Sequence, residues 1–562
     1  MPFPYTFPFP FEFEAGGSIT PTGALSSQVS RTLAGAITPS GSVSSQRART
    51  FAGGVTPSGD VSRLLSRTLS GAITPSGVLT GAFIPANRYI LQVDWNGDGD
   101  FADALEDTSA YLMATSIVRG RDRDMGDFNA STCTLTLRND DKRFTPNYAS
   151  SPLYPNVRAG LKVRLIQRYL GTSYNLFTGY TDRPSCDHES RTATLYCVDE
   201  MKRLGQKRIS TALQTDVRTP TILDAVLAAA GFTGSTHKDA GIDQVLYAGW
   251  YDEVALSAIR ELEQAERASV WIDGDGDMRL EDRHHRLKAP HTTALATYTG
   301  IAEAGPYELR VDDVINEADV TASPVVPAAE SDIYTLAHKL ALAPGASETI
   351  LIDYSGVALD VVQPSAAALT LVANDAPNDS GTDRSSSIGV AFTGYAAGAS
   401  VVLTNNHSTH VYVTTYTVKG KKLDRGSITK HTEDATSQTQ YGERSTSLSR
   451  ALMANPNVAQ SIADYIVATK KDPADGIDIE FTASKNAANM LAALTREISD
   501  RVHIEEDVYS VDGDFFIEGI EHSIQEGGLN YRVTWRLSEA PASENLFIIG
   551  TTLLNAGALM AY

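Results

Sequence analysis

Four copies of an 18-residue unit open this sequence. A T-P-[ST]-G core recurs in each copy, with its proline at Pro21, Pro39, Pro57 and Pro75. Proline and glycine in every unit make a continuous helix costly, and the core is typical of a β-turn. Because one unit buries little surface, the copies must stack on one another, on the rest of the chain or on another subunit. The pattern predicts a strand-turn array or solenoid over 17–87, with a loosely ordered arm as the alternative.

Beyond residue 88 the dominant pattern is the two-residue alternation of β-strands. Cys133, Leu135 and Leu137 alternate with threonines, and a turn sequence follows directly. Further short strand-like segments lie at 89–94, 161–165, 176–180 and 192–198. Short strands separated by turns are typical of a β-barrel or sandwich. A second set with the same alternation lies late in the chain, at 477–481 and in a hairpin of 515–524 with 529–537.

The sequence between the two β-sets is mixed. Thr219 and Pro220 have the form of a helix start and Gly231 that of its end, and a second helix is expected over 255–265. Residues 322–422 are rich in small uncharged side chains and predict a β-sandwich-like insertion. We therefore expect a mainly β fold with a smaller α+β part. Its expected divisions are a Pro/Phe-rich segment (1–16), the repeat array (17–87), a first β-domain (88–205), a mixed α/β domain (206–321), the insertion (322–422), a second β-domain (423–540) and a C-terminal strand or tail (541–562).

The charge balance and the cysteine count exclude several classes of protein. Asp and Glu outnumber Lys and Arg by 68 to 47, a net charge of −21 that opposes stable binding to nucleic acid. The three cysteines, Cys133, Cys186 and Cys197, are too few for a disulfide framework and fit a reducing cytoplasm. Proline alternating with phenylalanine at the start does not form a signal helix, and residues 546–562 are too short and polar to span a bilayer comfortably.

The segment DWNGDGD at 94–100 is the strongest metal-like motif. Its side-chain oxygens alternate along the loop, as Ca²⁺ requires, at Asp94, Asn96, Asp98 and Asp100. The carboxylate expected at the twelfth position falls on Leu105, one residue before Glu106, although Asp103 or Glu106 could contribute from a different loop. Asp/Asn-Gly runs also turn a chain between strands. A turn is the favoured interpretation, and a Ca²⁺ site at these four residues is the alternative. Ca²⁺ is the one cofactor that we consider.

Three other groups of reactive side chains fit structural roles. The acids at 273–277 alternate with glycines between two strand-like segments and predict a hairpin turn. His284, His285 and His291 lie among basic residues that would repel a cation, so we expect a solvated basic loop. Cys186 has a histidine nearby but no legible orienting group, so the cysteines are expected to be core thiols. We predict no catalytic residue, no nucleic-acid-binding residue and no enzyme activity.

A series of short motifs in fixed order carries a family resemblance. It begins with QVDWNGDGDF and continues through CTLTLRNDDKRFTP, and its segments are 92–101, 118–120, 133–146, 151–154, 160–164 and 176–179. Later segments continue the series, at 314–316, 411–420, 440–444, 516–524 and 533–535. Over about residues 88–540 the chain resembles the tail-tip, or baseplate hub, proteins of long-tailed bacteriophages and their prophages.

The resemblance implies a structural virion protein. Each subunit of a homotrimer would carry two related β-barrel hub domains, here 88–205 and 423–540, so that three subunits form a pseudo-sixfold ring on a sixfold tail tube. The implied partners are tail-tube or distal tail ring proteins, tip or central fibre proteins, and the host cell surface. DNA would pass through the lumen without stable binding, for which we expect an acidic excess on the lumen. The implied location is the tail tip, after assembly in the bacterial cytoplasm.

Two alternative functions remain open at this point. One is a tail-associated receptor- or glycan-binding protein that acts through the insertion. The aromatic side chains available there for a sugar platform are Tyr334, Tyr354, Phe392, Tyr395 and Tyr412, most of which are expected to be needed as core. The other is a Ca²⁺-dependent bacterial adhesin, which rests on the Asp94 loop alone.

Overall fold

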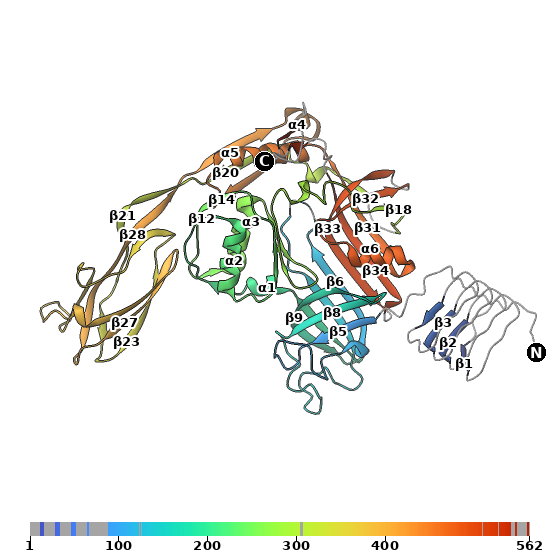
Figure 1. Ribbon diagram of the computed structural model, residues 1–562, viewed down its shortest axis with the longest axis horizontal. Coiled ribbons are helices and arrows are strands. Elements are labelled where there is room, and N and C mark those ends of the chain that lie inside the picture. The colour runs from blue at the N-terminus through green and yellow to red at the C-terminus, as the bar shows by residue number, and fades with distance from the viewer. Residues whose placement is uncertain are drawn as a thin grey trace, which may run out of the picture.

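A computed structural model describes residues 88–540 apart from 123, 125, 304–306, 508–509 and 526–527, together with six short strands nearer the two ends. This part of the chain is mainly β, as the alternation predicts (Figure 1). None of its helices combines the length and the apolar character that crossing a membrane requires.

One 12-stranded sheet, built from early and late strands, is the largest sheet among the described residues. Its strands follow the order β19-β31-β34-β33-β6-β7-β10-β9-β8-β5, and β32 also pairs with β33 and β18. The early strands are β5 (Arg88–Val93), β6 (Leu112–Gly120), β7 (Thr132–Arg138), β8 (Lys162–Tyr169), β9 (Thr172–Asp187) and β10 (Thr192–Val198). The late strands are β18 (Thr297–Thr299), β19 (Tyr307–Arg310), β31 (Ala474–Thr482), β32 (Arg501–Glu506), β33 (Val511–Gln525) and β34 (Asn530–Glu539).

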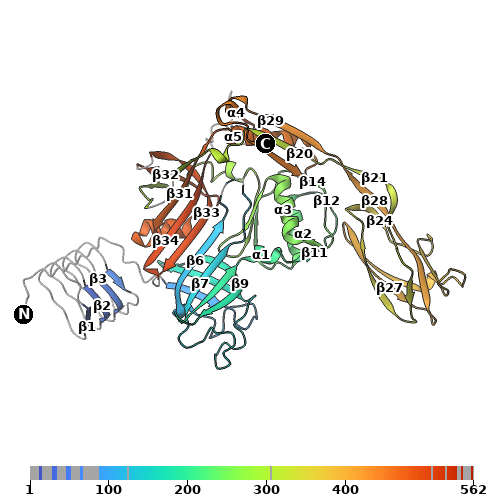
Figure 2. The ribbon, with the colours of Figure 1, turned by 180° about the vertical axis from the view of Figure 1, so that it is seen from behind.

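The two expected β-domains are therefore halves of one curled sheet rather than separate barrels. Figures 1 and 2 show the early strands and the late strands side by side from both directions. The expected start of the second domain at residue 423 needs correction, because the strands between 423 and 473 pair with β20 in a different sheet. The late half of the large sheet takes its first strand after the insertion at β31, residue 474.

A single hydrophobic core runs through both halves of the sheet. The predicted alternation holds, since Cys133, Leu135 and Leu137 are all buried in this core. In the late half, Trp535 packs edge-on against Phe481 with ring centroids 4.9 Å apart. The helix α6 (Ala487–Thr495) contributes further apolar side chains to the same core.

The mixed α/β domain has its own core. The helix α2 (Thr219–Ala230) starts one residue earlier than predicted and holds a proline in its first turn. It ends as predicted at Gly231, whose φ of 72° is left-handed and therefore favours glycine. The other helices are α1 (Glu200–Leu204) and α3 (Ala255–Glu266), and the strands include the hairpin β16 (Ser269–Ile272) and β17 (Met278–Glu281).

A small α/β unit brackets the insertion. Its sheet has the order β29-β20-β30, and α5 packs on it around a separate apolar cluster. Its elements are β20 (Glu317–Ala322), β29 (Ile428–Glu433), α4 (Ala435–Tyr441), β30 (Ser445–Arg450) and α5 (Pro456–Lys470). The chain thus enters the insertion after β20 and returns from it through β29, which pairs with β20.

The insertion forms an arm of two sheets that share one core, and it projects from the body in Figure 1. One sheet contains β21 (Val325–Thr335), β22 (Leu340–Leu342), β24 (Ala358–Val362), β25 (Leu371–Asn374) and β28 (Val411–Arg425). The other contains β23 (Ser347–Asp353), β26 (Ile388–Gly394) and β27 (Gly398–Asn405). The arm contacts the mixed domain where the Ala396 amide donates to the Thr211 carbonyl at 2.9 Å and Tyr395 packs on Tyr251.

Strands also occur in the repeat region. The strands β1 (Glu12–Ala15), β2 (Gln28–Leu33), β3 (Gln46–Phe51) and β4 (Leu64–Ser66) form a parallel sheet in that order. Gln28 pairs with Gln46 and Gln46 with Leu64, so the register follows the 18-residue repeat. The predicted turns lie outside the described residues, as do most of 1–16 and of 541–562. The solenoid therefore stays a prediction.

Candidate functional site

The seam between the two halves of the sheet is where segments from opposite ends of the chain meet. Antiparallel pairing of β6 with β33 joins Thr115 to Ile524 at one end and Gly120 to Gly519 at the other. Gly120 has a φ of 98°, and a Cβ there would overlap the carbonyl oxygen of Glu518. Only glycine allows so close an approach of the two backbones.

The face of the sheet opposite the core carries short hydroxyl side chains across this seam. Ser116 of β6 pairs with Thr134 of β7 on one side and with Ser523 of β33 on the other. Thr194 of β10 lies opposite Thr136 of β7, so two further hydroxyl side chains lie within the early half. The row Ser523–Ser116–Thr134 thus crosses the seam without a charge, and it ends at Arg532 of β34 on one side and at Tyr196 of β10 on the other.

A group of buried charges, which we call the ionic junction, lies at one end of the seam. Its central residue is Glu518 of β33, which is 1% exposed. The Glu518 carboxylate accepts hydrogen bonds from Arg121 Nε at 2.7 Å and from Arg286 Nη2 at 3.0 Å. Ser538 of the neighbouring strand β34 donates to the same carboxylate. The junction therefore ties the early half, the late half and the mixed domain to one carboxylate.

A second carboxylate extends the ionic junction to the small α/β unit. Asp124 lies 3.3 Å from Arg121 Nη2 and 2.9 Å from Lys470 Nζ at the end of α5. Burial by itself would raise the pKa of Asp124 and of Glu518, but the surrounding cations outweigh burial and hold both pKa values below their ordinary range. Both carboxylates are therefore ionised at neutral pH.

A chain of hydrogen bonds leads away from the junction into the mixed domain. Ser499 is fully buried, accepts from Arg286 and donates to Glu281, and Glu281 lies 3.1 Å from His285. His285 Nδ1 is 2.8 Å from Asp239. Burial raises the pKa of Glu281 to about 7, so this carboxyl is partly protonated near neutral pH. The Ser499 hydroxyl donates to a carboxylate rather than to the histidine and has no exposed surface, so this chain of hydrogen bonds links the late half to the mixed domain.

The basic segment at 283–291 is not the solvated loop that the sequence predicts. Its Arg286 guanidinium is held by Glu518 and lies over the ring of Phe516 at 4.7 Å from the centroid. His291 is buried, and its ring centroid lies 4.6 Å from that of His285. The prediction failed because Glu518, which holds Arg286, comes from a distant part of the chain, although Glu281 and Asp282 beside the segment pair with His285 and Lys288.

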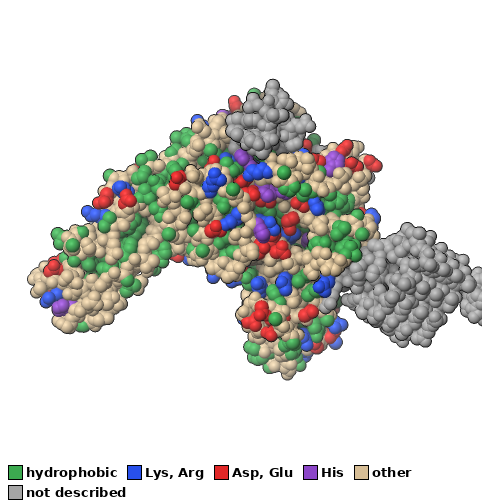
Figure 3. Space-filling model, viewed as in Figure 1, with side chains coloured by type: hydrophobic (Ala, Val, Ile, Leu, Met, Phe, Trp, Pro, Cys, Tyr) green, Lys and Arg blue, Asp and Glu red, His purple; other side chains and the backbone are tan. Residues whose placement is uncertain are grey.

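A polar cavity of about 380 Å³ lies beside the ionic junction. Side chains from the early half, the mixed domain, the small α/β unit and the late half line it, among them Arg121, Glu263, Arg286, Arg450 and Phe516. In Figure 3, basic, acidic and histidine side chains gather over the middle of the body, whereas the arm carries few charges. The four parts of the body thus meet around charges here, while Trp271 of the mixed domain stacks on Phe128 within the core of the sheet.

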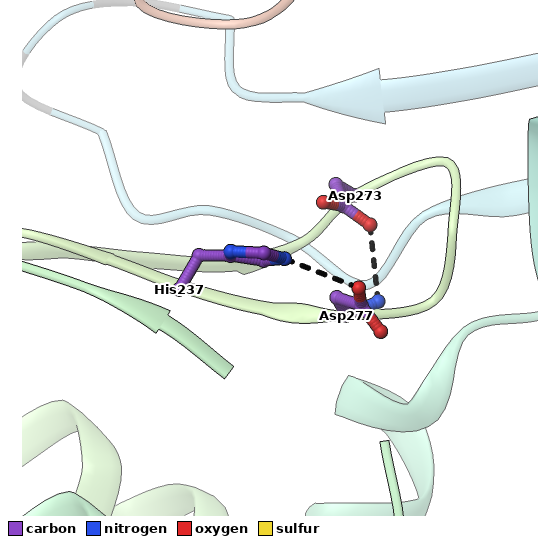
Figure 4. Close-up of side chains that lie close together, drawn as sticks. All are labelled: His237, Asp273 and Asp277. Atoms are coloured by element: carbon purple, nitrogen blue, oxygen red, sulfur yellow. Dashed lines mark hydrogen bonds and ion pairs between the residues drawn. The ribbon is translucent and has the colours of Figure 1, made fainter. Parts of the chain in front are cut away.

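The acids at 273–277 form the predicted hairpin turn between β16 and β17. The Asp273 carboxylate accepts the amides of Asp275 and Asp277 at 3.0 Å each, and its other oxygen binds Arg279 at 2.7 Å. His237 points at Asp277, with Nε2 3.2 Å from the carboxylate (Figure 4). Because a guanidinium already neutralises Asp273, this trio is explained by the turn.

The segment at 94–100 forms a tight turn, the favoured interpretation, in which the Asp94 carboxylate accepts the amides of Gly97, Asp98 and Gly99. Of the four residues of the alternative Ca²⁺ site, the turn brings some together and not others. Asp94 and Asp98 converge, each with an oxygen within 4.8 Å of the other and of Glu106. Asn96 lies between carboxylates and donates to Asp98 at 2.8 Å. Asp100 instead accepts the amide of Ala102 at 2.9 Å. Glu106, one residue late for a regular Ca²⁺ loop, belongs to the cluster.

The three cysteines are free. Cys133 and Cys197 lie opposite each other in the pairing of β7 with β10 and are buried, as expected of core thiols. Burial raises the pKa of Cys133 to about 12, which keeps this thiol protonated. Cys186 differs from the expectation, because it is exposed.

Comparison with known proteins finds tail proteins among the structural neighbours of this chain. No protein-family model and no curated protein matches it. It is similar to a tail protein from Neisseria meningitidis, at 11% identity and a TM-score of 0.44, with 81% of this chain and 99% of that chain covered. It is also similar to a 43 kDa prophage tail protein from Shewanella oneidensis, at 12% identity and a TM-score of 0.43, covering 81% and 99%. A prophage tail protein from Listeria monocytogenes has 8% identity and a TM-score of 0.38, covering 80% and 94%. Likeness at this level does not carry a functional argument by itself.

Proposed function

We propose that this chain is a structural protein of a phage or prophage tail tip, where three copies form a pseudo-sixfold hub. The observation that carries the proposal is the seam. One subunit presents two β-halves side by side in a continuous curled sheet, joined by the pairing of Thr115–Gly120 with Gly519–Ile524. Three such subunits supply six β-halves, which is the number that a sixfold tail tube requires.

The hydroxyl face suits the wall of a channel for DNA. Short uncharged side chains such as Ser116, Thr134 and Ser523 offer phosphates no cation, so DNA in contact with them releases few counterions and binds weakly. In this proposal the centre of the channel wall is neutral, rather than acidic as the net charge of −21 suggested. The absence of strong contacts with DNA is expected in either case.

The ionic junction and the arm have separate roles in this proposal. The junction fixes the mixed domain and the small α/β unit to the sheet, because Glu518 and Asp124 bind cations from all of these parts. The arm projects from the body (Figure 2) and would contact fibre or tip proteins. Its use as a glycan platform is disfavoured, because Tyr354 is fully buried and the other four candidate aromatics are at least half-buried.

Two measurements test the hub. Light scattering of the purified chain should give about 181 kDa, three times the 60.3 kDa of one chain. Immunogold labelling of phage lysate particles with an antibody against the arm should place gold at the distal end of tails, and an antibody pre-absorbed with the purified chain serves as the control. A monomer at every concentration together with gold on cell surfaces, or on no particle, would refute the proposal and favour a free binding protein.

A further inference from the structure

The loop after β5 covers the edge of the large sheet. β5 is the last strand in the sheet order and pairs only with β8. The loop returns along its open side, where the Val93 amide donates to the Glu106 carbonyl at 3.0 Å and the Thr108 amide donates to the Leu91 carbonyl at 2.9 Å. Uncovered edge strands invite pairing with other chains, so this cover protects the sheet.

Three carboxylates converge inside this edge loop, and a fourth lies beside them. Asp94, Asp98 and Glu106 each place an oxygen within 4.8 Å of the other two. Asp103 joins them through Asn96, whose amide nitrogen donates to Asp98 at 2.8 Å and to Asp103 at 2.5 Å. Like charges this close repel one another unless a cation or protons neutralise them.

The state of Glu106 is the independent observation that points to a ligand. Its side chain is 1% exposed, and Oε2 accepts the Asp103 amide at 2.9 Å. The other oxygen, Oε1, is buried and has no hydrogen-bond partner among the described residues. A buried carboxylate oxygen without a partner is costly.

The other acidic clusters of the described chain differ from this one, because each of them contains a histidine beside its carboxylates. Asp273 also binds Arg279 at 2.7 Å, while His431 lies 2.8 Å from Asp319 and His503 lies 3.1 Å from Asp512. Across the described residues, no lysine or arginine forms an ion pair with the four acids of the edge loop. Arg158, whose guanidinium lies beside Gly97, does not pair with them either.

We propose that Asp94, Asp98, Asp103 and Glu106 bind one Ca²⁺ and thereby fasten the edge loop to β5. Ca²⁺ prefers carboxylate and carbonyl oxygens in irregular arrangements of six to eight ligands, so loop carbonyls and water would complete the shell. Asn96 cannot bind a cation through its amide nitrogen, so binding releases this nitrogen from between Asp98 and Asp103. Asp100 is not a ligand, which revises the set suggested by the spacing in the sequence.

The test uses the buried Trp95 next to Asp94 as an antenna for Tb³⁺ luminescence. Chelator-treated full-length chain should bind one Tb³⁺, and Ca²⁺ should displace it at no more than about 1 mM. We expect Glu106→Gln and Asp98→Asn each to weaken binding roughly tenfold or more, because each removes a charged ligand. Asp100→Asn removes the same charge from the same loop and should change binding less than about threefold.

Three results would overturn the site. They are the absence of sensitised luminescence in the native chain, no displacement by Ca²⁺ up to about 10 mM, and equal weakening by Asp100→Asn and the two ligand variants. Circular dichroism checks that each variant is folded, and if Glu106→Gln misfolds, the exposed Asp98 decides the question. As a second readout, Ca²⁺ should slow hydrogen exchange at the Thr108 amide. The assay uses the chain in solution, so its outcome is independent of the hub proposal.

Discussion

Replacement of Glu518 by glutamine should separate the parts of the body that the ionic junction holds together. The Glu518 carboxylate is shared by Arg121 and Arg286, which come from the early half of the sheet and from the mixed domain. Glutamine has nearly the same shape, but it carries no charge and turns one acceptor oxygen into a donor nitrogen. Two buried guanidinium groups would then lose their shorter ion pair and keep only Asp124, at 3.3 Å from Arg121 and 3.9 Å from Arg286.

The expected loss is large because the site is closed to solvent. Removal of one partner of a buried ion pair costs about 3–5 kcal/mol, and Glu518 is 1% exposed, so water does not screen the charge. For a sheet of this size, a urea dependence of about 3 kcal/mol per M converts that loss into a fall of roughly 1 M or more in the unfolding midpoint. The affected transition should be the one that includes the sheet.

Urea unfolding followed by tryptophan fluorescence measures this effect, since Trp535 lies in the core of the sheet. Glu521→Gln is the matched control. Glu521 lies three residues further along the same strand, its side chain is 38% exposed, and it is 3.8 Å from Arg536. The Glu521→Gln substitution should lower the free energy of unfolding by less than about 0.5 kcal/mol. If Glu518→Gln and Glu521→Gln unfold at the same urea concentration, the reasoning about the ionic junction is wrong.

Three further outcomes are expected. Gly120→Ala should lower the free energy of unfolding by about 3 kcal/mol or more in thermal or urea unfolding, and Gly160→Ala by about 1 kcal/mol. Both glycines have positive φ, but only at Gly120 would a Cβ meet neighbouring backbone. Equal losses would contradict the close approach of the two backbones at the seam. Burial lowers the pKa of His522, whose Nδ1 lies 2.8 Å from the Tyr531 hydroxyl, to about 3. The unfolded chain therefore binds a proton below about pH 6.5 that the folded chain does not. The free energy of unfolding should therefore fall as the pH falls. Between pH 7 and 5 the unsubstituted chain should lose about 2 kcal/mol more of it than His522→Gln, as measured by urea unfolding. An equal loss in both chains would show that this histidine is not held neutral. A thiol reagent should modify Cys186 alone in the folded chain, and the other two thiols only after unfolding, whereas reaction of all three in the folded state would contradict their burial.

Much of the local structure could be predicted from short-range pattern. The alternation at Cys133, Leu135 and Leu137 identified a strand and its buried face. Proline at 220 and glycine at 231 marked the ends of α2, because one lacks an amide and the other tolerates left-handed φ. The Asp273 turn followed for the same reason. In each case the residues that determine the structure are neighbours in the chain.

The candidate site could be predicted only in part. Segments 118–120 and 516–524 were marked by the family resemblance, and the structure joins them at the seam. A glutamate at 518 within an apolar strand was a signal that a buried partner exists, but nothing near it in the sequence identifies Arg286 as that partner. The basic segment around Arg286 was interpreted as solvated for the same reason.

Strand pairing had the same limit. The sequence showed strand-like segments after residue 423, but not that β29 and β30 pair with β20 while β31 joins the large sheet. Side-chain alternation along a strand specifies which residues face a core, since that depends on a period of two along one backbone. The partner across the hydrogen bonds, like the counter-ion of a buried charge, can lie hundreds of residues away. Arg121 and Glu518 are 397 residues apart and become neighbours only when the two ends of the chain close one sheet.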